Sequence, residues 1–174
     1  VAARSVFAPP VFAAILAPRI PTPSAPLAPL NATAVLTVAE MYRADAAAIA
    51  AGVPSLSLME AAGAAIAGAI RRRWRPRAVA VLCGPGNNGG DGFVAGRYLA
   101  EAGAAVAFYL FKSRDVLEDD NLARVEEMGL EVLLADFDQR YRVLRHRMRI
   151  TDIVIDALLG TGVSRPIAGP LAGL

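Results

Sequence analysis

One stretch decides the fold: Cys83-Gly84-Pro85-Gly86-Asn87-Asn88-Gly89-Gly90-Asp91-Gly92. The apolar run 78–82 precedes it and predicts a buried strand, and residues 93–100 carry apolar side chains three and four apart, as a helix does. The stretch therefore joins a strand to the start of a helix. Its glycines let the backbone turn sharply and approach a ligand closely. Backbone N–H groups at such a helix N-terminus bind phosphates and other anions.

The same stretch fits the Gly-x-Gly-x-x-Gly fingerprint of dinucleotide-binding proteins only in part. That fingerprint needs an acidic residue at the end of the second strand to hold a ribose hydroxyl. The second predicted strand, 105–111, is followed by Lys112 instead, which disfavours an ordinary dehydrogenase. Two asparagines and an aspartate among the glycines suit a cation or a polar ligand. The alternative is a tight turn in which Asp91 caps the helix.

Helix and strand patterns alternate along the rest of the chain. Thr37 and Glu40 form a capping box that starts a first helix, which ends at Gly52. A second helix starts at Ser55 or Ser57. Further helices are predicted over 90–102, 119–128 and 137–149, and further strands over 105–111, 131–134 and 152–159. This alternation predicts an α/β fold with a mainly parallel sheet and right-handed crossovers.

The last predicted strand carries a second candidate site. It reaches Asp156 and then a second glycine loop, residues 160–166. Ligands of parallel sheets bind beyond the carboxyl ends of the strands, so this loop should lie close to the first one. A carboxylate there needs a cation or hydrogen-bond donors. Asn88 and Asp156 are therefore candidate oxygen ligands of one hard cation. The alternative is that Asp156 caps its own loop through backbone N–H groups.

Composition narrows the class of protein. A net charge of +2 over 174 residues does not indicate a nucleic-acid partner. Cys83 is the only cysteine and is expected to be a buried, inert thiol. No apolar run reaches the roughly 20 residues that span a membrane, and we expect a cytoplasmic protein. Residues 1–35 hold seven of the twelve prolines, so we expect this segment to be disordered. The alternative is an organelle-targeting segment, which its few arginines and many prolines disfavour.

Three motifs in this order resemble the YjeF N-terminal domain family, the NAD(P)H-hydrate epimerases. The segment 58–63, Leu-Met-Glu-Ala-Ala-Gly, is similar to an early helix of the family. The segment 84–92 matches its first glycine loop without a gap. The segment 156–162 with Arg165-Pro166 matches its second loop. The resemblance covers residues 36–174, which we expect to form the epimerase domain.

The resemblance implies a fold and a function. Family members have a Rossmann-like three-layer sandwich and interconvert the R and S epimers of hydrated NADH and NADPH, so that a dehydratase can restore the cofactor. It implies one potassium ion per subunit, held by Asn88 and Asp156. It also implies a homodimer and an ADP- or ATP-dependent dehydratase as the functional partner, in some relatives fused downstream. The implied substrate-binding residues are Asn87, Asn88, Gly89, Gly90, Asp91, Gly160, Thr161, Gly162, Val163, Ser164, Arg165 and Pro166.

The sequence departs from the family pattern in two places. Ala61 stands where the early helix usually has asparagine. The family's later Asp-x-Pro-Ser-Gly segment, which carries the best catalytic candidate and a potassium-binding serine, would follow Leu174. We therefore expect a C-terminally truncated domain whose catalytic residue is unknown. A non-catalytic binding module of the same fold is the alternative, although the presence of both Asn88 and Asp156 favours the enzyme.

Overall fold

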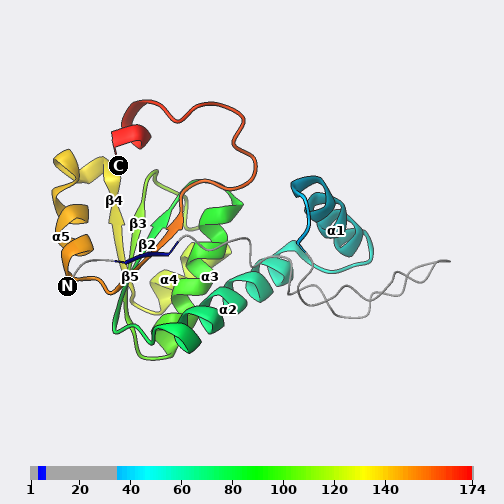
Figure 1. The fold of residues 1–174 in the computed structure, drawn as a ribbon, viewed down its shortest axis with the longest axis horizontal. Helices are drawn as coiled ribbons and strands as arrows, with labels where there is room; N and C mark the ends of the chain where they lie inside the picture. The colour runs from blue at the N-terminus through cyan, green and yellow to red at the C-terminus, as the bar shows by residue number, and fades with distance from the viewer. Residues whose placement is uncertain (1–3, 7–34, 174) are drawn as a thin grey trace.

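A parallel β-sheet between two layers of helices forms the body of the protein (Figure 1). The structure, a computed structural model, describes residues 4–6 and 35–173. The sheet has the strand order β1-β5-β2-β3-β4, and every pairing is parallel. The strands are β1 Arg4–Val6, β2 Ala78–Cys83, β3 Ala105–Leu110, β4 Glu131–Leu134 and β5 Ile153–Ala157.

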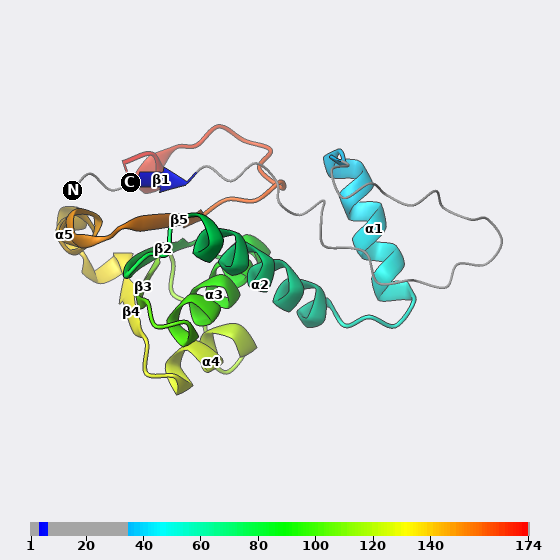
Figure 2. The same cartoon turned by 60° about the horizontal axis from the view of Figure 1, so that its bottom comes forward.

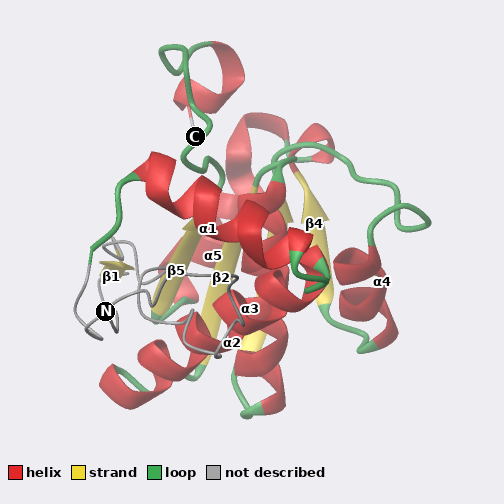
Figure 3. Ribbon diagram, turned by 90° about the vertical axis from the view of Figure 1, so that its right-hand side faces the viewer, coloured by secondary structure: helices red, strands yellow, loops and turns green. Residues whose placement is uncertain are grey.

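Helices cover both faces of this sheet (Figure 3). They are α1 Val38–Ala50, α2 Ser55–Arg73, α3 Asn87–Glu101, α4 Asp120–Glu127 and α5 Arg142–Ile150. Helices α2, α3 and α4 lie on one face and α5 lies on the other (Figure 1). The three-layer α/β prediction is therefore confirmed. The capping box at the start of α1 also forms, because Thr37 and Glu40 exchange side-chain and backbone hydrogen bonds.

The larger core lies between α2, α3, α4 and the sheet. Phe93 of α3 and Phe108 of β3 are fully buried there, with their ring centroids 5.5 Å apart. Strands β2 and β3 are buried along almost their whole length, as expected of central strands covered on both faces. A smaller apolar cluster under α5 includes Leu82 and Leu144. Helix α3 thus contributes several of the buried side chains of the larger core.

Two glycines let α3 approach its neighbours closely. A Cβ on Gly63 of α2 would lie 2.4 Å from Cβ of Val94, and a Cβ on Gly92 would lie 2.7 Å from Cβ of Ala157 in β5. Carbon atoms in ordinary contact are about 3.5–4.0 Å apart, so neither position has room for a side chain. Part of the glycine content of these motifs therefore reflects helix packing rather than a ligand.

Two predicted helices differ from the structure. Helix α3 begins at Asn87, three residues before the predicted start, with Gly86 as its N-cap. The two asparagines thus belong to its first turn. The predicted helix 137–149 is broken: 3₁₀ turns span Ala135–Phe137 and Gln139–Tyr141, and α5 begins only at Arg142. The break follows from buried Asp138, whose carboxylate accepts hydrogen bonds from the backbone N–H groups of Val143 and Leu144.

One part of the N-terminal segment is ordered, although the sequence predicts disorder for all of residues 1–35. Arg4–Val6 forms β1 and pairs with β5, in register from Arg4 with Ile153 to Val6 with Ile155. The pairing satisfies backbone groups along the outer edge of β5. Apart from β1 and Val35, the prediction for residues 1–35 lies outside the described residues.

Candidate functional site

The two glycine segments meet at the carboxyl ends of β2 and β5. The backbone N–H of Gly84 donates to the carbonyl of Ala157 at 3.0 Å, which extends the ladder between the strands into the loops. A Cβ on Gly84 would lie 1.8 Å from the carbonyl oxygen of Leu158. Only glycine fits there, so the close approach of the two segments requires Gly84.

Asn88 connects the segments through its side chain. Its Nδ2 donates to the carbonyl of Leu159 at 3.1 Å. The same residue lies against the second loop, since a Cβ on Gly160 would be 3.3 Å from Cβ of Asn88. The structure thus brings together Asn88 and the start of the 160–166 loop, as the sequence predicted.

The first turn of α3 offers donors for an anion. Its N-cap is Gly86, and no side chain caps the helix. Asn87 is exposed, whereas Gly89 and Gly90 are buried. Uncapped N–H groups and the positive end of the helix dipole favour a phosphate or carboxylate at this position. Asp91 does not cap the helix, because it lies inside α3 beyond the first turn.

The carboxyl group of Asp91 has a raised pKa. Burial, and after it the charge of Asp45 on α1, raises the pKa of the Asp91 carboxyl to about 7. This half-buried carboxyl can therefore hold or release a proton near neutral pH. Asp45 has no motif around it, and the sequence did not predict it at the site.

Asp156 lies at the same edge with its side chain exposed. Its Oδ1 accepts a hydrogen bond from the backbone N–H of Leu158 at 3.0 Å, as the capping alternative predicted. This bond also ends β5 two residues before the predicted end. One hydrogen bond does not use the full acceptor capacity of a carboxylate, so Asp156 can also face a cation.

The chemical type of the donor atoms at this edge suits a potassium ion. The side-chain oxygens of Asn88 and Asp156 are hard donors, which alkali and alkaline-earth cations prefer over nitrogen and sulfur. The described residues contain no group of three or more His, Cys, Asp or Glu side chains that could hold a metal. A site of one amide and one carboxylate therefore suits a weakly bound cation better than a structural transition metal.

The second loop contacts α1, a helix that the sequence did not connect with the site. The hydroxyl groups of Tyr42 and Thr161 are 3.1 Å apart and form a hydrogen bond. Figure 2 shows the segment after β5 extending toward α1 before it returns. Residues 160–166, including Val163, Ser164, Arg165 and Pro166, are otherwise exposed. Tyr42 thus anchors an exposed loop at the site.

Glu60, which belongs to the 58–63 motif, and Cys83 have structural roles. Glu60 of α2 accepts from Arg97 of α3 at 2.6 Å and from Arg124 of α4 at 3.4 Å, so it joins three helices. Cys83 is fully buried, and this burial raises the pKa of its thiol. The expectation of a buried, inert thiol is confirmed.

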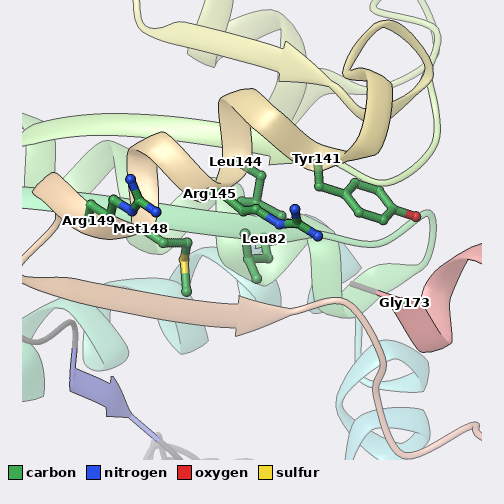
Figure 4. A pocket seen from close by; sticks show the side chains of 7 residues that line it. All are labelled: Leu82, Tyr141, Leu144, Arg145, Met148, Arg149 and Gly173. Carbon is green, nitrogen blue, oxygen red and sulfur yellow. The ribbon is translucent and has the colours of Figure 1, made fainter.

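A cavity of about 260 Å³ lies elsewhere, between α5 and the other face of the sheet (Figure 4). Its lining contains none of the residues predicted to bind substrate or metal; it consists of Leu82, Tyr141, Leu144, Arg145, Met148, Arg149 and Gly173. Among the residues that the structure describes, no helix combines the length and the apolar character required to cross a bilayer.

The fold is that of a doubly wound α/β domain, and its two glycine segments meet at the carboxyl ends of β2 and β5, the edge at which ligands of such folds bind. The chain belongs to the family described as YjeF-related protein N-terminus, whose model matches residues 55–174. All three motifs that carry the resemblance lie within this match.

Named relatives and a solved structure agree with this assignment. A bifunctional NAD(P)H-hydrate repair enzyme Nnr of Thermofilum pendens is 43% identical over 68% of this chain and 23% of its own length. An NAD(P)H-hydrate epimerase of Rhodobacter capsulatus is 42% identical over 79% of this chain and 66% of its own length. The crystal structure of yeast ynu0, YNL200c, superposes with a TM-score of 0.59 at 26% identity, covering 71% of this chain and 55% of that one. The chain therefore spans about a quarter of the Thermofilum enzyme and about two thirds of the Rhodobacter epimerase.

Proposed function

We propose that this chain provides the epimerase site that interconverts the R and S epimers of hydrated NADH and NADPH. The observation that carries the proposal is the junction of the two family loops, where Gly84 is hydrogen-bonded to Ala157 at the end of β5 and Asn88 to Leu159 just after it. The names of the relatives as NAD(P)H-hydrate epimerase and repair enzyme support the substrate.

In this proposal the dinucleotide lies along the carboxyl edge of β2 and β5. The uncapped N-terminus of α3 binds its phosphates, and the 160–166 loop covers the other side. Asp91, whose pKa of about 7 lets it hold or release a proton near neutral pH, would exchange a proton with the ligand. Asn88 and Asp156 would hold potassium, which would supply positive charge beside the substrate phosphates.

Partners and location are further parts of the proposal. We expect a homodimer in the cytoplasm and a functional link to an ADP- or ATP-dependent dehydratase. The bifunctional relatives support this link, because their name describes an enzyme with a second activity. The dehydratase consumes only one epimer. With the chain present, the other epimer would be converted to that one, so that the dehydratase would restore all of a mixed pool of epimers to NADH or NADPH.

The experiment couples the chain to a dehydratase that accepts one epimer and follows the return of NADPH absorbance. The chain is expected to convert the fraction that the dehydratase alone leaves untouched, with a higher rate in potassium than in sodium chloride. Asp156→Asn keeps an acceptor for the Leu158 N–H but loses the charge, and it should remove the potassium effect. Asp136→Asn, the same change at an exposed residue, is the matched control. Full potassium-dependent activity in Asp156→Asn would refute the cation site.

A further inference from the structure

Arg114, from the segment between β3 and α4, lies against the first turn of α3. Its Nη1 is 3.0 Å from the point that a Cβ on Gly89 would occupy. Its guanidinium lies over the ring of Phe93, 5.2 Å from the centroid. Its Nε pairs with Oδ2 of Asp119 at 2.7 Å. These contacts fix a positive charge immediately behind the glycine segment.

Arg114 adds positive charge where the helix N-terminus is already positive. The N-terminus of a helix carries a partial positive charge, so an arginine beside the first turn of α3 repels it. Oδ2 of Asp119 pairs with Nε of Arg114, while Oδ1 of Asp119 accepts from the backbone N–H groups of Asn121 and Leu122. Nη1 of Arg114 is buried and has no hydrogen-bond partner among the described residues. A buried donor without a partner costs stability.

We propose that Arg114 is a positioning residue for the pyrophosphate of the bound dinucleotide. It raises the positive potential at the N-terminus of α3, and its guanidinium packs beside Gly89 in the first turn of that helix. The inference rests on the proposed function, because it takes the ligand to be a dinucleotide. In doubly wound folds the pyrophosphate sits at this helix N-terminus, whereas the ribose 2′ position is read after the second strand. Contact with Gly89 in the first turn of α3 therefore favours the pyrophosphate over a 2′-phosphate.

The test measures the affinity of the chain for NAD⁺ and NADP⁺ by titration calorimetry at low salt. Arg114→Met removes the charge and keeps an apolar side chain over Phe93. It should weaken both ligands about tenfold, as expected for the loss of one charge-assisted interaction. Arg114→Lys keeps the charge and should stay within about threefold of the wild type. Arg124→Met removes the same charge from a half-exposed side chain of α4 and is the matched control.

The possible results separate the inference from the proposed function. A wild-type chain that binds neither dinucleotide overturns both. Wild-type affinity in Arg114→Met overturns the role of Arg114 alone, and a loss confined to NADP⁺ overturns the pyrophosphate assignment. Melting temperatures are recorded for every variant. If Arg114→Met does not fold, Arg114→Gln replaces it, with the same expected loss of affinity for both ligands.

Discussion

The close contact between α2 and α3 can be tested with two glycines of the same helix. Gly63 and Gly68 both lie inside α2, and alanine has the higher helix propensity by about 1 kcal/mol at either position. Their surroundings differ. A Cβ on Gly63 would lie 2.4 Å from Cβ of Val94 and 2.9 Å from the backbone nitrogen of Ala95. A Cβ on Gly68 would meet only the end of the Arg72 side chain, at 3.3 Å.

The two alanine substitutions should therefore have opposite signs. At Gly63 the new methyl group is more than about 1 Å too close to α3, and overpacking of this kind costs about 1–3 kcal/mol or more. Because a clash of this size belongs at the upper end of that range, about 3 kcal/mol, and the gain in helix propensity offsets about 1 kcal/mol, we expect Gly63→Ala to lower the free energy of unfolding by about 2 kcal/mol. Arg72 can move aside, so Gly68→Ala should raise that free energy by about 0.5–1 kcal/mol.

Urea unfolding followed by circular dichroism measures both changes on one scale. The slope of the free energy against urea should stay the same in the three proteins, which shows that the midpoints report stability. Equal stabilisation by both alanines would refute the reasoning, because it would mean that α2 moves away from α3 without cost. Destabilisation by both would mean that the close contact of Gly63 with α3 does not distinguish it from Gly68.

Two further predictions concern charged side chains. Asp91→Asn should stabilise the chain by roughly 2–4 kcal/mol at pH 8 and by less than about 1 kcal/mol at pH 4. The sign follows from a folded-state pKa of about 7, against 3.8 for an ordinary aspartate, caused first by burial and then by Asp45. The wild type therefore loses stability as the pH rises from about 4 to 7, and a flat difference between the two proteins over this range would contradict the assignment. Glu60→Gln leaves the buried Arg97 without its ion-pair partner and should cost about 2–3 kcal/mol in urea unfolding. Glu131→Gln breaks the exposed pair with Arg147 and should cost less than about 1 kcal/mol; equal losses would mean that burial does not matter here.

The parts of the fold that sequence could predict are those with a local pattern. The strands 78–82 and 105–111 are continuous apolar runs, and both form central strands. The capping box at Thr37 is a short-range signal and was found correctly. The start of α3 differs from the prediction because glycine and asparagine disfavour helices. Gly89 and Gly90 are needed there for another reason, since Gly84 and Met59 leave no room for a Cβ at either position.

The break before α5 and part of the candidate site depend on contacts between distant residues. Asp138 interrupts the predicted helix because its buried carboxylate binds backbone N–H groups of the next turn and the hydroxyl of Tyr109. Asn88 and Asp156 were predicted together from the rule for parallel sheets. Tyr42, Asp45 and Arg114 were not, since no local motif marks them and only the folded chain brings them to the glycine segments.

The contact between Tyr42 and Thr161 has a consequence for synthesis of the chain. The two residues are 119 positions apart, so α1 is made long before the loop that it anchors. At about 5–20 residues per second, a ribosome needs roughly 6–24 s to reach the loop after Tyr42 has been added. During this interval the first glycine segment is also added, but the contact between α1 and the second loop cannot form until Thr161 has been made. The anchoring of the second loop is therefore among the last contacts that each new molecule can form.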